Sequence, residues 1–162
     1  MGRAATLIDR VRRICYATTI TQTPGTPEYT YRLNRTAMRS PRGSDRRRGG
    51  VGGEAFDDRC PDGELVVGIL GRSGSLLDRL QVVCGRVDYK RASSTSRTWT
   101  ADHTVTRILS GAGGSGGTSF LYLCPESSVA TQISGYTFTG SAGNQVIGSI
   151  RLGCRALGYT PQ

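Results

Sequence analysis

The cysteines and the single histidine are the residues of this 162-residue chain that could hold a metal or form disulfides. Cys60 and Cys84 lie 24 residues apart, and Cys124 and Cys154 lie 30 apart. Zinc sites use closely spaced ligand pairs, so this spacing predicts no metal site. One disulfide within each pair fits better and requires an oxidising compartment. The alternative is reduced cysteines packed as small apolar residues.

The acidic residues do not form a catalytic arrangement in the sequence. Asp102 precedes the only histidine, His103, and Asp57 precedes Asp58. Adjacent residues of a strand point to opposite faces, so neither pair would act together. The segment GVGGEA (50–55) has no apolar strand before it and no helix after it, which argues against dinucleotide binding. We therefore expect neither an enzyme nor a cofactor.

An internal repeat dominates the sequence and must position these residues. The segment GGVGGEAFDDRCP (49–61) matches GGSGGTSFLYLCP (113–125) without a gap, and GRAATLIDRVRRIC (2–15) matches GRSGSLLDRLQVVC (71–84). A third copy of the second phrase, GSAGNQVIGSIRLGC (140–154), requires one inserted residue. Its Ile147, Ile150 and Leu152 take the apolar positions of Leu77, Leu80 and Val82. The repeat defines a partial unit (1–48) and two further units (49–112 and 113–162).

The composition agrees with short strands and turns. Hydrophobic residues make up 36% of the chain, aromatic residues 7%, and there are 23 glycines. Alternating, β-branched stretches predict strands at 29–33, 64–70, 76–84, 104–109, 129–138 and 146–154. The stretch LIDRVRRI (7–14) could form a helix, but its two sibling copies carry residues typical of strands. We therefore expect an all-β domain.

The repeated phrases also carry a resemblance to known families. GGVGGEAFDD followed by GILGRSGSLLDRLQVV resembles the signature stretches of jacalin-related lectins. The Cys-Pro starts and the IGSIRLGC ending are similar to the vitelline membrane outer layer protein. Both resemblances imply a β-prism of three pseudo-repeated Greek-key sheets, here with the first unit incomplete at the N-terminus. The expected partner of Cys15 would belong to the missing part, and a second chain or a homo-oligomer could complete the unit.

The lectin resemblance implies a carbohydrate site, and the second copy fits it best. The loop would consist of Gly74, Ser75, Leu76, Leu77 and Asp78, with Gly49 and Gly50 as the neighbouring loop. A carboxylate accepts hydrogen bonds from adjacent sugar hydroxyls, and glycines permit close backbone approach. The alternative is structural: Asp78 bonds its own loop, and the glycine pairs form turns with positive φ. The sugar-stacking aromatic common in the family is replaced by Ser75 and Leu76.

Arginine accounts for the net charge of +9, since Lys90 is the only lysine. The densest run surrounds Arg42, Arg46, Arg47 and Arg48, and it is either a solvated loop or a contact for a polyanion. No stretch is apolar enough to span a membrane. The leading expectation is a secreted, carbohydrate-binding protein. The alternative is a non-enzymatic structural or assembly protein whose arginine-rich loop contacts an acidic partner.

Overall fold

A computed structural model describes most of the chain, namely residues 2–4, 7–11, 15–23, 25, 30–39, 48–50, 53–91, 93, 95–96, 99–140 and 143–157. All regular secondary structure in these ranges is β-strand, which confirms the expected all-β class. None of the described residues forms a helix that could cross a membrane. The stretch that could have been a helix contains a strand, Ile8–Val11.

Each predicted stretch contains a strand, and several strands extend further, but β3 (Cys15–Gln22) lies where none was predicted. They are β1 (Gly2–Ala4), β2 (Ile8–Val11), β3 (Cys15–Gln22), β4 (Thr30–Arg39), β5 (Arg48–Gly49), β6 (Glu54–Phe56), β7 (Leu65–Ser73), β8 (Leu77–Arg91), β9 (Trp99–Ile108), β10 (Ala112–Gly113), β11 (Thr118–Leu123), β12 (Ser128–Thr139) and β13 (Gln145–Ala156). The strand β8 has 15 residues and extends beyond the predicted 76–84, because it continues past Cys84 to pair with β9 and β4.

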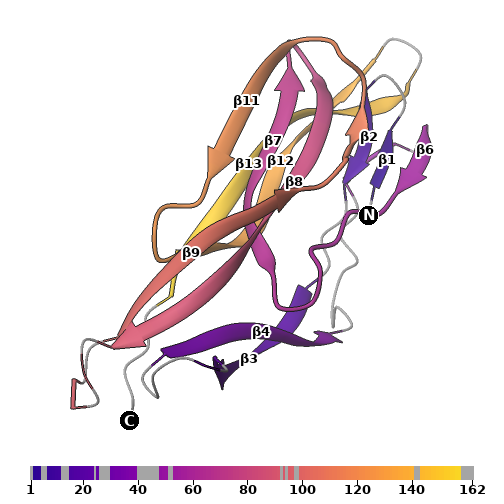
Figure 1. The fold of residues 1–162 in the computed structure, drawn as a ribbon. Coiled ribbons are helices and arrows are strands. Elements are labelled where there is room, and N and C mark those ends of the chain that lie inside the picture. The colour runs from indigo at the N-terminus through magenta and orange to yellow at the C-terminus, as the bar shows by residue number, and fades with distance from the viewer. Residues whose placement is uncertain are drawn as a thin grey trace.

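The described strands make three antiparallel sheets (Figure 1). The first has the order β5-β2-β1-β6. The second has the order β11-β7-β8-β4-β3, with β9 and β10 also paired to β8. The third contains β12 and β13 alone. The Tyr31 and Trp99 rings meet edge to face at 5.1 Å, and Arg32 forms a 3.1 Å ion pair with Asp88, so β4 is held against β8 and β9 by side chains as well as by backbone pairing.

The three repeated hairpins share one register. Gly2 pairs with Val11, Gly71 with Leu80, and Gly135 with Ile150. In each hairpin the register shifts one residue after this glycine, toward the turn. The shifts lie between Arg3 and Ala4, Arg72 and Ser73, and Tyr136 and Thr137. All three hairpins therefore carry a β-bulge at the same place. A bulge changes the direction in which the following side chains point, so all three hairpins change direction at equivalent residues. The repeat in the sequence is therefore a repeat in strand pairing.

One prediction about the third copy is wrong. The alignment places Gly140 at the position of Gly71, whereas strand pairing places Gly135 there. The reason is length: β12 and β13 continue to Thr139 and Gln145, so their connecting loop lies further from the bulge than the loop of β7 and β8. The apolar matches at Ile147 and Ile150 are confirmed by the register.

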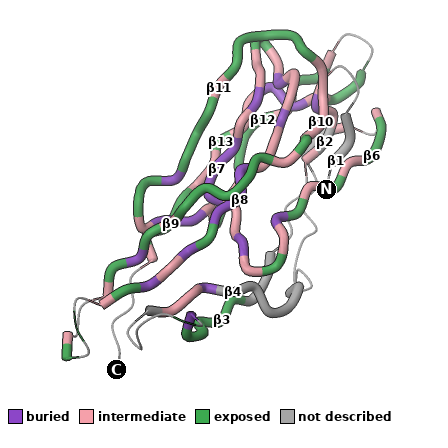
Figure 2. Tube along the Cα trace, in the orientation of Figure 1, coloured by how far each residue is buried: buried purple, intermediate pink, exposed green. Residues whose placement is uncertain are grey.

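Equivalent residues of the three hairpins meet in one core cluster. Ile8, Leu77 and Ile147 are 0%, 1% and 5% exposed and belong to it together with Ile69 and Leu80. A second cluster, around Val67, Val83 and Val87, combines residues of β4, β7, β8 and β9 with Val129 of β12. Figure 2 shows the buried residues concentrated along β7 and β8, while β11 and much of β12 are exposed.

Both predicted disulfides are confirmed. Cys60 bonds to Cys84, and Cys124 bonds to Cys154. In each unit the disulfide joins the Cys-Pro start to the second strand of the hairpin, which is β8 for Cys84 and β13 for Cys154. Cys15 opens β3 and pairs through its backbone with Arg39.

Candidate functional site

The loop between β7 and β8 carries most of the residues assigned by resemblance. Gly74 and Ser75 are exposed, Leu76 is half-buried, and Asp78 follows at the start of β8. The Gly74 backbone N–H donates to the carboxylate oxygen Oδ2 of Asp78 at 3.2 Å and to the Leu76 carbonyl at 3.1 Å. This is the local, loop-closing role that was the structural alternative for Asp78.

Leu77 does not contribute its side chain to the loop surface. It is only 1% exposed and lies in the core cluster with Ile8 and Ile147. Its assignment as a sugar contact is therefore wrong for the side chain, because the bulge after Arg72 turns this position inward. The exposed residues of this loop are Gly74 and Ser75, whereas Leu76 and Asp78 are half-buried.

The glycine loop beside Asp78 is not the one that the resemblance assigns. Gly50 donates its N–H to the carbonyls of Asp9, at 2.8 Å, and of Gln145, at 3.0 Å, so the loop with Gly49 and Gly50 belongs to the first hairpin. The neighbour of Asp78 is instead the second glycine loop, residues 113–117, since Gly114 donates its N–H to the Asp78 carbonyl at 2.8 Å. The cause is pairing: β5 aligns with β2, and β10 aligns with β8.

The glycine loop 113–117 packs tightly against the Asp78 carboxylate. A Cβ on Gly116 would lie 2.6 Å from Oδ1, and a Cβ on Gly117 would lie 2.6 Å from Oδ2. Gly117 also has a φ of +63°, which side-chain-bearing residues rarely adopt. The backbone of this loop therefore approaches the carboxylate as closely as only glycine allows.

Arg72 clamps the same loop, although the sequence reasoning does not single it out. Its Nε donates to the Gly116 carbonyl at 2.8 Å, and its Nη2 donates to the Gly117 carbonyl at 2.7 Å. The signal for it is the Gly-Arg dipeptide that recurs as Gly2-Arg3 and Gly71-Arg72. A bidentate guanidinium of this kind fixes two successive carbonyls.

The arrangement offers a defined set of polar groups at an exposed surface. Asp78 Oδ2 is bonded within the loop, whereas Oδ1 receives no hydrogen bond from the described residues. The Ser75 side chain and the backbone of Gly116 and Gly117 are exposed next to these groups. A carboxylate oxygen, a hydroxyl and peptide groups within one surface are suited to binding neutral, hydroxyl-rich ligands.

The residues considered for catalysis are dispersed. His103 lies in β9 and is half-buried, and the adjacent Asp102 is exposed. The described residues contain no group of three or more His, Cys, Asp and Glu side chains that could hold a metal ion. Burial raises the pKa of Asp58, and the neighbouring carboxylate of Asp57 raises it further. A hydrogen bond from the Gly111 N–H lowers it, but the net shift is upward.

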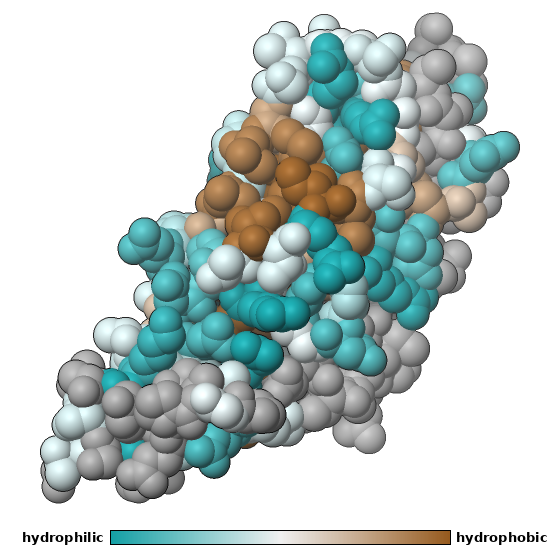
Figure 3. Space-filling model, in the orientation of Figure 1, coloured by the Kyte–Doolittle hydropathy of each residue, from teal (hydrophilic) through white to brown (hydrophobic). Residues whose placement is uncertain are grey.

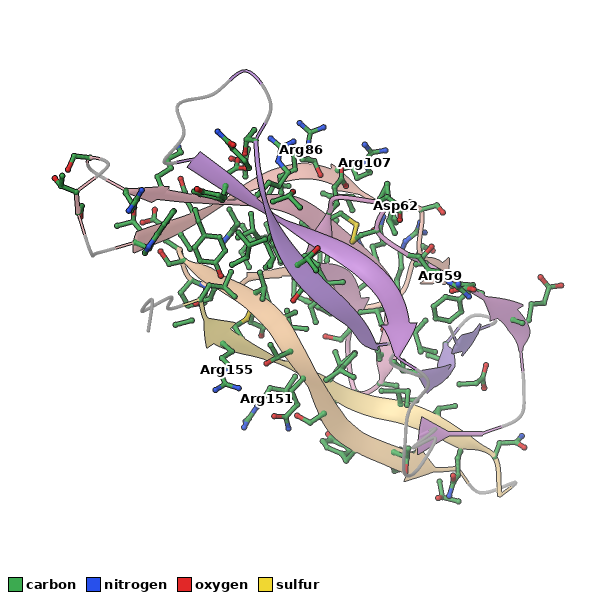
Figure 4. All side chains as sticks on the ribbon, turned by 90° about the horizontal axis from the view of Figure 1, so that it is seen from below. Arg59, Asp62, Arg86, Arg107, Arg151 and Arg155 are labelled. Carbon is green, nitrogen blue, oxygen red and sulfur yellow. A yellow bond between two sulfur atoms is a disulfide. The ribbon has the colours of Figure 1, made fainter. Side chains whose placement is uncertain are left out.

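The positive charges of the described residues lie on more than one side. Arg151 and Arg155 project from β13, whereas Arg86 and Arg107 project from the opposite side of the molecule (Figure 4). Arg107 is partly neutralised by Glu64 at 3.1 Å. Of the arginine-rich run, Arg42, Arg46 and Arg47 lie outside the described residues, and Arg48 is described only as the backbone of β5.

The chain has no significant match to a protein-family model, a curated protein or a solved structure.

Proposed function

We propose that this protein binds carbohydrate, without catalysing a reaction, at the surface formed by residues 74–78 and the glycine loop 113–117. The observation that carries the proposal is the Asp78 carboxylate, which is fixed through Oδ2 and leaves Oδ1 without a hydrogen bond from the described residues. A fixed carboxylate loses little side-chain entropy on binding, so its hydrogen bonds to sugar hydroxyls count more fully toward affinity. The exposed glycines Gly116 and Gly117 lie directly against this carboxylate and complete the surface.

The proposal also includes a β-prism fold and an extracellular location. Three hairpins of equal register around one core support a β-prism as the architecture. The two disulfides support an oxidising, extracellular location. The site does not include the aromatic that often stacks on the sugar, so weak monovalent binding is expected.

A glycan array with matched variants tests the proposal. Asp78→Asn removes the negative charge and half of the acceptor capacity with little change of shape, and Asp9→Asn makes the same change in the first hairpin. We expect the wild type and Asp9→Asn to bind the same glycans, and Asp78→Asn to lose them. Binding that survives Asp78→Asn, or a wild type that binds no glycan, rejects this site.

A structural or assembly role is the second candidate, and exposed apolar strands favour it. Leu121 and Leu123 of β11 are 53% and 47% exposed. Ile108, at the end of β9, is 47% exposed. Figure 3 shows apolar surface gathered over these strands. In this role the arginine-rich loop would contact an acidic partner. Retention on heparin should then fall when Arg46, Arg47 and Arg48 are replaced by serine, and unchanged retention would remove the polyanion contact.

A further inference from the structure

The first two hairpins are each flanked on both sides by one continuous segment. We call residues 48–56 and 112–120 the closing segments, because each carries the pattern Gly-Gly-x-Gly-Gly-x-x-Phe from its second residue onward. The first supplies β5 beside β2 and β6 beside β1. The second supplies β10 beside β8 and β11 beside β7. Each closing segment thus crosses its hairpin and turns a two-stranded ribbon into a four-stranded sheet.

The two closing segments bind their hairpins in the same register. Phe56 pairs with Gly2 as Phe120 pairs with Gly71. The Phe120 ring lies over Gly71, since a Cβ there would be 2.5 Å from its Cζ atom. Because the ring occupies the place of a side chain, the pattern requires a glycine in the hairpin opposite the phenylalanine.

The third hairpin has the same receptor features but no closing segment. Gly135 stands at the position of Gly71, and the bulge is retained. No other described strand pairs with β12 or β13, although the Gly50 N–H donates to the Gln145 carbonyl of β13 at 3.0 Å. Without such a segment, the outer strand of the third hairpin is more accessible to solvent. Gly135 and Gln132 are exposed, whereas their counterparts in the second hairpin, Gly71 and Gly68, are buried.

The disulfide at the end of the hairpin shows the same contrast. Cys84 is 0% exposed, and its counterpart Cys154 is exposed. Each of these cysteines forms the disulfide to the Cys-Pro start of its own unit. The third hairpin is therefore built like the other two and packs Ile147 into the core, but no closing segment pairs with it among the described residues.

The contacts that clamp a closing segment differ in the third hairpin. Tyr136 stands at the position of Arg72, and Gly148 at the position of Asp78. The Tyr136 ring fills the space of the missing carboxylate, since a Cβ on Gly148 would lie 2.4 Å from its Cε2 atom. Tyr136 itself is 62% exposed. In the third hairpin, an aromatic ring and a glycine therefore replace the charged side chains of Arg72 and Asp78.

We propose that β12 and β13 form an acceptor site for an extended peptide with the pattern Gly-Gly-x-Gly-Gly-x-x-Phe, presented by a partner polypeptide. Main-chain hydrogen bonds along an exposed strand edge provide the affinity, and the glycine-phenylalanine match provides the register. We choose a partner over a second copy of this chain, because both closing segments among the described residues already pair with their own hairpins. The site is separate from the carbohydrate surface.

Hydrogen exchange with a synthetic peptide tests the acceptor. The probe is the peptide of residues 48–57, which carries the pattern with two acidic residues for solubility, and its control has alanine in place of the phenylalanine. We expect the probe to slow exchange across 132–137 about tenfold and the control peptide to have no effect. Protection at β1 or β7 instead would mean that the peptide displaces an existing closing segment, and no protection anywhere would also overturn the proposal.

A gain-of-affinity variant keeps the test independent of misfolding. Tyr136→Arg combined with Gly148→Asp restores the side chains of the second hairpin, and removing the ring makes room for the new aspartate. We expect the double variant to bind the probe peptide about tenfold more tightly, because charge-assisted hydrogen bonds are added. Equal affinity of the two proteins contradicts docking in the shared register. A doubled mass in sedimentation, with 132–137 protected in the absence of peptide, would show that a second copy covers the site and would overturn the choice of partner.

Discussion

The backbone N–H of Gly114 donates a 2.8 Å hydrogen bond to the carbonyl of Asp78, and Gly50 makes the same 2.8 Å bond to Asp9. Gly114 and Gly50 are equivalent in the repeat, as are Asp78 and Asp9. The glycine loop of each unit is therefore fastened to the aspartate of the preceding hairpin. In the second hairpin this places the loop against a carboxylate at the surface.

Gly117 should be intolerant of any side chain. We expect Gly117→Ala to lower the free energy of unfolding by about 1–3 kcal/mol, because its φ is positive and the Cβ would lie 2.3 Å from the Ser73 carbonyl carbon. Gly74→Ala is the matched control, since the nearest atom to a Cβ at Gly74 is 3.8 Å away. Chemical denaturation of both variants measures the difference, and equal stabilities would contradict the loop geometry.

Arg107 should stabilise the fold through the buried Glu64. The Glu64 side chain is 3% exposed, its Oε1 accepts from Arg107 at 3.1 Å, and its Oε2 has no hydrogen-bond partner in the described structure. Arg107→Gln removes the charge that compensates this carboxylate, and we expect a loss of about 1–3 kcal/mol. The exposed Arg86 on the neighbouring strand serves as control, and Arg86→Gln should change stability by less than about 0.5 kcal/mol. A similar loss in both variants would indicate a general effect of charge.

Asp58 should make stability fall as the pH rises. Burial, its largest perturbation, raises the pKa of Asp58 above the usual 3.8, so the folded protein holds this proton to a higher pH than the unfolded chain does. The stability due to the proton is fully present below 3.8 and is lost as the pH rises through the raised pKa. We expect Asp58→Asn to be more stable than the wild type at pH 7 and to lose this advantage below the unfolded pKa. Denaturation curves that show no advantage at pH 7 would contradict this.

The two disulfides should differ in their resistance to reductant. Cys60 and Cys84 are both buried, at 4% and 0% exposure, whereas Cys154 of the other disulfide is exposed. We expect mild reductant and a thiol-alkylating reagent to label Cys124 and Cys154 first, because thiol exchange requires access to a sulfur atom. Each disulfide closes a loop whose constraint is worth roughly 3–4 kcal/mol. Labelling of Cys60 before Cys154 in peptide mass mapping would reverse the expected order.

The hairpins and disulfides could be predicted from the sequence because their signals are local and repeated. Apolar residues at fixed positions and cysteines at equivalent ends identified each hairpin. Which strands share a sheet could not be predicted. Each closing segment belongs to one unit in the sequence but pairs with the hairpin of the preceding unit. The same displacement explains why Gly49 and Gly50 lie at Asp9 and residues 113–117 at Asp78.

Two residues of the candidate site show other limits of sequence reasoning. Leu77 was assigned to the sugar loop by resemblance, and the bulge in β8 turns its side chain into the core. Arg72 gave no distinct signal, because it is one of many arginines, and its role depends on two carbonyls 44 and 45 residues further along the chain.

Mapping of a bound glycan by nuclear magnetic resonance tests the central claim most directly. The glycan is the strongest ligand found on the array, titrated into the wild-type protein with backbone amide signals as the readout. We predict that the largest shifts fall on Gly74, Ser75, Gly116 and Gly117, and that they vanish in Asp78→Asn while the remaining spectrum stays unchanged. The largest shifts elsewhere, with these four amides unmoved, would contradict carbohydrate binding at the Asp78 surface.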